Sequence, residues 1–283
     1  MKSFCIKTNN EEIIEYLLNK ISKIDYLNIY YCNKTLKKYQ NIILHYREDE
    51  VDKFINVVTN IIIDTIINFY QEGIIKRLIN VNYFYFDEFE KNIIYDNCEE
   101  FLEQEMEDLF ETIFLEIKKY LETNRNIVLE GVVNFRISGY VKILDNIVDM
   151  AVNKYIIEKE YKEFISLLKI FINTTNPKSE ILHLIYINGE SILLDKNKNI
   201  IQLKDKIDNM KYLSDISFSS NDLALNTLLS MLPKEIDIHI IDKEDDFINT
   251  LKLIFENRIK ICTDCNICRT YKILQCGQKN IYK

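Results

Sequence analysis

The spacing of hydrophobic and polar positions changes several times along the chain, and each change predicts a structural element. Residues 3–7 are typical of a strand, and apolar residues three and four apart then predict a helix to about residue 23, with Asn9 as its N-cap. Two segments rich in β-branched and aromatic residues, 26–32 and 41–47, indicate two more strands. The N-terminal part is therefore expected to form a small βαββ layer.

The next part of the chain is mainly helical in its periodicity. A broad apolar face predicts a helix from residue 50, with Gly73 near its end or at a kink. Residues 80–86 have the composition of a short strand. Two further helices are expected, one from Asp87 to about residue 98 and one, acidic on one side, over 100–121.

The longest helically periodic stretch runs from Glu130 to Ile172. Its first residues are rich enough in β-branched side chains to form a strand, whereas the apolar residues from Tyr140 to Tyr155 recur at helical spacing. A second helix is expected around residues 161–171. It should end before the proline at position 177, because the residue that precedes a proline is disfavoured in the helical region.

Beyond residue 177 the pattern becomes that of an α/β layer. Asn188-Gly189 between two apolar runs predicts a hairpin with a type I′ turn. Alternating elements follow, with strands at 200–203, 215–218, 235–241 and 258–262 and helices at 219–232 and 242–256. Strand–helix–strand order predicts parallel pairing with right-handed crossovers.

The fold class expected from these elements is α/β, in the mixed α+β sense. It comprises the βαββ layer, a helical middle, and a C-terminal hairpin plus a βαβαβ parallel sheet. Three regions are predicted: an N-terminal α/β region with its following helices (1–100), a central helical region (101–177) and a C-terminal α/β region with a cysteine-rich tail (178–283).

Composition and charge narrow the classes of protein to which the chain can belong. A net charge of −8 argues against a general nucleic-acid binder, because phosphate contact needs a basic face. The most apolar run, residues 57–69, is interrupted by Asn60, Asp64 and Asn68, so we expect no membrane span. The N-terminal lysine is not followed by an apolar run, so we expect no secretory signal. The seven cysteines, an odd number, therefore favour a cytoplasmic protein with free thiols.

Four of those cysteines form the chemically distinctive feature of the sequence: Cys262, Cys265, Cys268 and Cys276. Thiolates converging from a short loop suit Zn²⁺ or an iron–sulfur cluster. The spacing differs from the ferredoxin run, whose fourth cysteine comes sooner, and from a zinc ribbon, whose CxxC pairs are farther apart. A dithiol redox pair and ordinary reduced cysteines stay open as alternatives.

Other polar residues give weaker indications. Ser219, Asp242 and Cys262 each follow a predicted strand, so they should share the edge where α/β sheets bind ligands, although helix capping explains the first two more simply. Asp237 and His239 share one face of a strand, which we interpret as half-exposed surface. The histidines lie far apart in sequence and match neither a catalytic triad nor an HExxH motif: His45, His183 and His239. No catalytic residue is predicted.

The stretch from Glu130 to Ile172 also has a distinctive order of residues. A Gly-hydrophobic-x-x-Phe-Arg segment leads into a helix, followed by Val-Asp-x-Ala-Val and Glu-Lys-Glu-Tyr-x-Glu-Phe-Ile. The residues concerned are Gly131, Phe135, Arg136, Val148, Asp149, Ala151, Val152, Glu158, Lys159, Glu160, Tyr161, Glu163, Phe164 and Ile165. This order resembles the central signature of the YtxC-like sporulation proteins.

The resemblance implies an endospore-forming, low-GC Gram-positive source and a role in sporulation, and it implies no reaction. We therefore expect a non-enzymatic accessory or interaction protein of the cytoplasm with a protein partner, and no contact with membrane or nucleic acid. The alternative is a metal-binding protein (Zn²⁺ or iron–sulfur) or a thiol-redox protein that uses Cys262, Cys265, Cys268 and Cys276.

Overall fold

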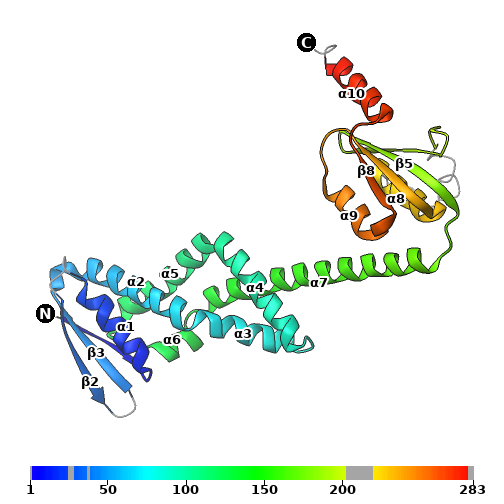
Figure 1. Ribbon diagram of the computed structural model, residues 1–283. Helices are drawn as coiled ribbons and strands as arrows, with labels where there is room; N and C mark the ends of the chain where they lie inside the picture. The colour runs from blue at the N-terminus through cyan, green and yellow to red at the C-terminus, as the bar shows by residue number, and fades with distance from the viewer. Residues whose placement is uncertain (1, 25–28, 37–38, 202–218, 280–283) are drawn as a thin grey trace, which may run out of the picture. The chain divides into compact units, whose positions relative to one another are not determined.

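The computed structural model in Figure 1 describes residues 2–24, 29–36, 39–201 and 219–279. It confirms a mixed α/β fold with two four-stranded sheets among these residues. Internal contacts divide the chain into two compact units, residues 1–158 and 159–283. The boundary between the units therefore lies inside the region predicted as the central helical one (101–177). No boundary falls at residue 100, because helices on both sides of it share one hydrophobic core.

The first unit contains the predicted βαββ layer. The strands of its sheet have the order β2-β3-β1-β4. The elements of this layer are β1 (Lys2–Thr8), α1 (Glu11–Ser22), β2 (Tyr30–Leu36), β3 (Tyr39–Tyr46) and β4 (Asn126–Val128). β4 pairs parallel with β1, whereas the other neighbours are antiparallel. The N-cap of α1 is Asn10 rather than the predicted Asn9, because its Oδ1 accepts the amides of Glu12 at 2.9 Å and Ile13 at 3.4 Å.

Helices supply the rest of the first unit: α2 (Val51–Phe69), α3 (Gln71–Asn82), α4 (Glu88–Gln104), α5 (Met106–Thr123), α6 (Leu129–Phe135) and the first part of α7 (Ser138–Thr174), with a 3₁₀ turn at Glu48–Glu50. The helix predicted from residue 50 breaks at Tyr70 and not at Gly73, which lies inside α3. The predicted helix over 100–121 is divided at Glu105. Periodicity defines the buried face of a helix better than its ends.

The predicted strand at residues 80–86 is wrong. Its first residues end α3, and the aromatic residues form a turn before Asp87 caps α4. The turn is bound to α7, because the Tyr83 hydroxyl donates to Asp149 Oδ1 at 2.5 Å. Tertiary hydrogen bonding therefore overrides the β propensity of this aromatic segment.

α7 is one continuous helix, so the prediction of a separate second helix around residues 161–171 is also wrong. Residues 156–160 contain neither glycine nor proline, and their side chains favour a helix, so nothing interrupts the backbone hydrogen bonds. The buried residues of its first half join the core of the first unit. Ile165 and Ile172 join the core of the second unit.

The start of α7 depends on a carboxylate from α5. Glu116 accepts the backbone amide of Gly139 at 2.8 Å and that of Tyr140 at 3.3 Å. A negative group at this position also complements the positive end of the helix dipole. A Cβ atom at Gly139 would lie only 3.0 Å from Glu116 Oε1, so a larger residue there would require this carboxylate to shift. The buried Tyr140 completes the junction by donating its hydroxyl to Gln71.

The second unit is built on a sheet with the order β6-β5-β7-β8, formed by β5 (Ser179–Ile187), β6 (Glu190–Leu194), β7 (Pro233–Ile240) and β8 (Ile259–Cys262). The predicted hairpin is confirmed: Asn188 and Gly189 have φ angles of 53° and 79°, as a type I′ turn requires. β7 pairs parallel with β5 and with β8. The predicted strand at 215–218, and half of that at 200–203, lie outside the described residues.

The two faces of this sheet carry different coverings. α8 (Ser220–Met231) and α9 (Asp246–Phe255) pack on one face and form the larger core with it. The other face carries a smaller cluster of Ile185, Leu194, Ile241 and Cys268. Cys268 belongs to α10 (Asn266–Lys279), the helix that follows β8 at the end of the chain (Figure 1). The candidate site lies on this second face.

Candidate metal centre

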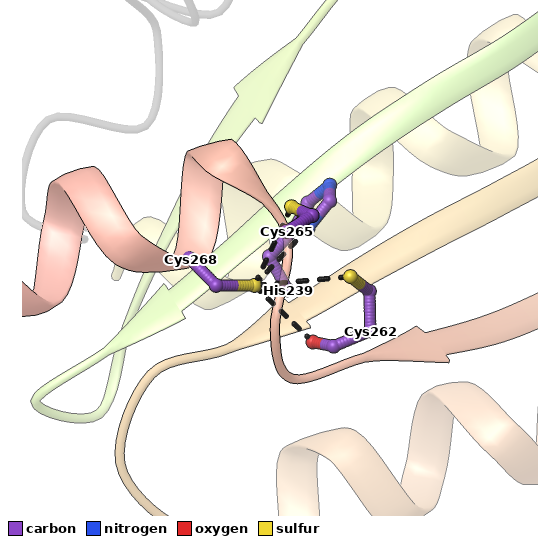
Figure 2. Close-up of side chains that lie close together, drawn as sticks. All are labelled: His239, Cys262, Cys265 and Cys268. Atoms are coloured by element: carbon purple, nitrogen blue, oxygen red, sulfur yellow. Dashed lines mark hydrogen bonds between the residues drawn. The ribbon is translucent and has the colours of Figure 1, made fainter.

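Four side chains with nitrogen or sulfur ligand atoms meet on this face: His239, Cys262, Cys265 and Cys268 (Figure 2). Parallel pairing of β7 with β8 places Cys262 opposite His239 in register, so both side chains point to the same face. Cys265 follows a short turn, and Cys268 lies in the first turn of α10. Within the described part of the chain, this is the one group with the geometry of a metal site.

Four of the six distances between the ligand atoms are close to those of a tetrahedral site. Cys268 Sγ lies 3.7 Å from Cys265 Sγ and 3.9 Å from Cys262 Sγ. His239 Nδ1 lies 3.4 Å from Cys265 Sγ and 3.5 Å from Cys268 Sγ. Bond lengths of about 2.3 Å to sulfur and about 2.0 Å to nitrogen separate ligands around tetrahedral zinc by about 3.8 Å (S to S) and about 3.5 Å (S to N). All four atoms lie within 4.8 Å of one another.

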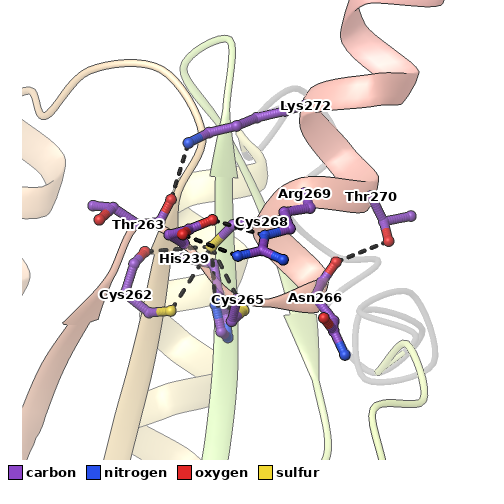
Figure 3. A network of polar contacts seen from close by, with 10 residues as sticks. His239, Cys262, Thr263, Cys265, Asn266, Cys268, Arg269, Thr270 and Lys272 are labelled. Atoms are coloured by element: carbon purple, nitrogen blue, oxygen red, sulfur yellow. Dashed lines mark hydrogen bonds and ion pairs between the residues drawn. The ribbon is translucent and has the colours of Figure 1, made fainter.

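The loop that carries the cysteines is tied to α10 by two contacts on its outer side (Figure 3). The Asp264 carboxylate forms a two-pronged ion pair with Arg269, at 2.9 Å to Nε and 3.1 Å to Nη2. Lys272 Nζ donates to the backbone carbonyl of Thr263 at 2.9 Å. These contacts fold the loop between Cys262 and Cys265 back on the helix. Cys265 itself directly precedes α10, where its carbonyl accepts the Arg269 amide at 2.9 Å, so it lies one helical turn from Cys268.

Burial and hydrogen bonding shift the pKa values of the ligand groups. Burial raises the pKa of Cys268 to about 11. Burial also opposes the Cys265 thiolate, but hydrogen bonds with the Cys268 backbone and with the neighbouring thiols outweigh it and lower the pKa of Cys265. His239, only 4% exposed, has a lowered pKa because of burial and of the nearby His183. At neutral pH His239 is thus uncharged, which is the form that binds metals.

The structure brings together three of the four predicted ligands. Cys276 belongs to α10, but its side chain lies outside the described ones, so its role as a ligand stays a prediction. His239 is a ligand candidate that the sequence pattern did not reveal, and its interpretation as half-exposed surface is wrong. The signal that could have identified it is the alignment of the C-terminal ends of two parallel strands, at residues 239 and 262.

The other residues predicted for this edge have structural roles. Ser219 caps α8 in a capping box with Asp222, as helix-cap spacing predicts. Asp242 was expected to begin the next helix, but Asp245 is the N-cap of α9. Asp242 Oδ2 instead accepts the backbone amide of Asn188 at 2.7 Å and so holds the hairpin turn.

The isolated cysteines and the acidic run lie in the first unit. Cys5, Cys32 and Cys98 are free thiols, and burial raises the pKa of Cys98 to about 12, which makes it chemically inert. The acidic residues around the junction of α4 and α5 are mostly exposed, as a solvated helix face should be: Glu99, Glu100, Glu103, Glu105, Glu107 and Asp108.

No described helix has the length and apolarity needed to cross a membrane.

Comparisons with known proteins agree with the signature found in the sequence. No solved structure matches the chain. A protein described as "Uncharacterized protein YtxC" from Bacillus subtilis (strain 168) is 25% identical over 193 residues, which cover 65% of this chain and 68% of the relative.

The family match spans most of the chain. The YtxC-like family matches residues 56–260, from α2 to β8. The matched segment includes His239 and ends just before Cys262, so the evidence for the metal centre comes from its geometry. By this match the chain belongs to the YtxC-like family.

Proposed function

We propose that the chain is a zinc-binding protein in which Cys262, Cys265, Cys268 and His239 hold one structural Zn²⁺. The observation that supports this most directly is the set of four distances between ligand atoms, 3.4 to 3.9 Å, which matches four of the six edges of a zinc tetrahedron. Three thiolates and one imidazole are also a common donor set for structural zinc.

The same geometry favours zinc over an iron–sulfur cluster. A cluster places several iron and sulfide ions between its cysteines, whereas these ligand atoms all lie within 4.8 Å of one another and surround room for a single ion. Four protein ligands would fill a tetrahedral coordination shell and leave no position for a substrate. The proposed centre is therefore structural, in line with a non-enzymatic protein.

The task of the metal would be to fasten α10 to the sheet. α10 contributes one buried side chain, Cys268, to the small cluster on this face, with Ile267 and Tyr271 partly buried around it. Ordering a helix costs about 1–2 kcal/mol per residue in backbone entropy, which so few apolar contacts offset only in part. A metal that joins β7, β8 and α10 would supply the missing stabilisation.

Metal analysis of the purified chain tests this proposal. Chain purified under anaerobic conditions should contain about one zinc per molecule, and exchange with Co²⁺ should give the visible absorption of a tetrahedral thiolate complex. A brown chromophore with several irons per chain would establish a cluster instead. A metal-free chain whose Cys265 and Cys268 form a disulfide on mild oxidation by a disulfide reagent would support the thiol-redox alternative.

The cellular role that we propose is that of an accessory or interaction protein in sporulation. The sporulation setting comes from the family resemblance, and a reducing compartment such as the cytoplasm keeps cysteines available as thiolate ligands. Two exposed aromatic side chains support an interaction: Phe84, in the turn between α3 and α4, is 75% exposed, and Phe89, in the first turn of α4, is 73% exposed. Aromatic side chains on a well-anchored turn are typical of binding hot spots. Asp87 and Glu88 beside them favour a protein partner with an apolar pocket and a basic rim.

The double substitution Phe84→Ser and Phe89→Ser tests the interaction role. Both side chains are exposed, so the free energy of unfolding should change by less than about 1 kcal/mol. The variant should still bind zinc but should form fewer heat-resistant spores when it replaces the parent chain in its host. Val81→Ser, also exposed but on α3, is the matched control. Unchanged spore counts for the double variant would contradict the role of this turn.

A further inference from the structure

His239 has a second contact on the side away from the thiols. Its Nδ1 faces Cys265 and Cys268, whereas its Nε2 lies 3.3 Å from Nδ1 of His183 on β5. The two rings lie 5.4 Å apart between centroids. The His183 side chain is only 12% exposed, so its contact with His239 is largely shielded from water.

Metal binding would determine which ring nitrogen of His239 carries the hydrogen, and so which histidine of the pair donates. A neutral imidazole that binds a metal through Nδ1 carries its hydrogen on Nε2. That hydrogen points at His183, so Nε2–H of His239 donates to Nδ1 of His183, which accepts through its lone pair. Metal-bound histidines characteristically donate their other N–H to a nearby acceptor, and this hydrogen bond fixes both tautomer and ring orientation.

Resting on the zinc centre proposed above, we propose that His183 is a positioning residue that holds His239 with its Nδ1 directed at the metal. His183 and His239 lie on neighbouring strands: the parallel register of β5 and β7 aligns His183 with Asp237, two residues before His239, on the same sheet face. The sheet thus supplies His239, its support His183 and the Cys262 thiolate, while the loop and α10 supply the two remaining thiolates.

A carboxylate lies near the same His183 nitrogen, which in this tautomer has no hydrogen to donate to it. Asp237 Oδ2 lies 3.4 Å from His183 Nδ1. Its negative charge favours positive charge on the His239 ring, and a metal-bound imidazole carries part of the charge of the ion. Asp237 therefore supports the bound metal electrostatically, without being a ligand.

Zinc competition with a chromophoric chelator tests the role of His183 in the full chain. His183→Leu removes the acceptor and should weaken zinc binding about 10–100-fold, the usual effect of losing such a partner. His183→Gln keeps an acceptor oxygen and should recover much of the affinity. His45→Leu, at a histidine that contacts Ser3 in the first unit, should leave zinc affinity unchanged.

Nitrogen NMR of the histidine rings adds a readout that a purely structural role would not move. In the zinc-loaded parent, His239 should show a metal-bound Nδ1 and a slowly exchanging Nε2–H, and His183→Leu should speed the exchange of that hydrogen. If His183→Leu binds zinc as tightly as the parent, the positioning role is refuted while the zinc centre stands. If the parent chain itself takes no zinc, the proposed function fails.

Discussion

Cys268→Ser is expected to abolish stoichiometric zinc binding and to release α10 from the sheet. Cys268 is the buried thiol among the ligands, and its Sγ contacts the other three ligand atoms. Zinc contributes on the order of 10–16 kcal/mol at four-ligand structural sites, so exchanging one thiolate for a weakly binding hydroxyl should lower zinc affinity by about 1,000-fold or more. Zinc per chain, measured after dialysis against a weak chelator, gives the first readout.

Hydrogen exchange gives the second readout for Cys268→Ser. The amides of α10 should exchange much faster in the variant than in the zinc-loaded parent, while those of α8 and α9 on the other face should change little, because a separate core holds these helices. Treating the parent with a strong chelator should reproduce the same pattern. Slow exchange of α10 in the metal-free chain would contradict a fastening role for the metal.

Two further cysteine substitutions serve as controls for the measurement of zinc content. Cys32→Ser, in β2 of the first unit, should retain full zinc content. Cys276→Ser distinguishes the two possible ligand sets: zinc should be retained if His239 completes the site and lost if Cys276 does. His239→Ala should have the opposite outcome, since it removes the nitrogen ligand that lies 3.4 Å from Cys265 Sγ.

The contrast between Cys268 and His239 shows what the sequence could predict of the candidate site. Cys262, Cys265 and Cys268 lie within one short segment, so their spacing alone indicates convergence on a metal. His239 joins them through the register of β7 with β8, and His183 joins through the register of β5 with β7. Register depends on how the assembled sheet packs, so a single sequence does not specify it.

The same division between local and tertiary causes separates the confirmed elements from the wrong ones. Asn188-Gly189 predicted its turn because the required positive φ angles are a local property of these residues. The segment 80–86 misled because its aromatic residues favour a strand by composition, whereas contacts with α7 make it a turn. The interpretation of residues 140–171 as two helices failed because no residue within α7 interrupts it.

Two carboxylates in the stretch from Glu130 to Ile172 hold together the framework of the first unit. Glu130 accepts the Thr8 hydroxyl at 2.6 Å and the Asn9 amide at 3.1 Å, which joins the start of α6 to the end of β1. Asp149 accepts the hydroxyl of Tyr83 and so anchors the aromatic turn. These contacts are structural, which is why the stretch identifies a family without indicating a reaction.

Leu144→Ala tests that framework, and we expect it to lower the free energy of unfolding of the first unit by about 2–5 kcal/mol. Leu144 lies in α7 and is fully buried in the core of that unit. Alanine would remove the buried side chain and leave a cavity that the surrounding helices fill only in part. Denaturant unfolding, followed by a probe placed in the first unit, measures the change.

The matched control is the same substitution at an exposed leucine of the same unit. Leu115, in α5, is 58% exposed, so Leu115→Ala should change the free energy of unfolding by less than about 1 kcal/mol. Zinc content should stay at the parental level in both variants, because the ligands belong to the second unit. Equal losses of stability at Leu144 and Leu115 would contradict the placement of α7 in this core, since burial is the property in which the two sites differ most.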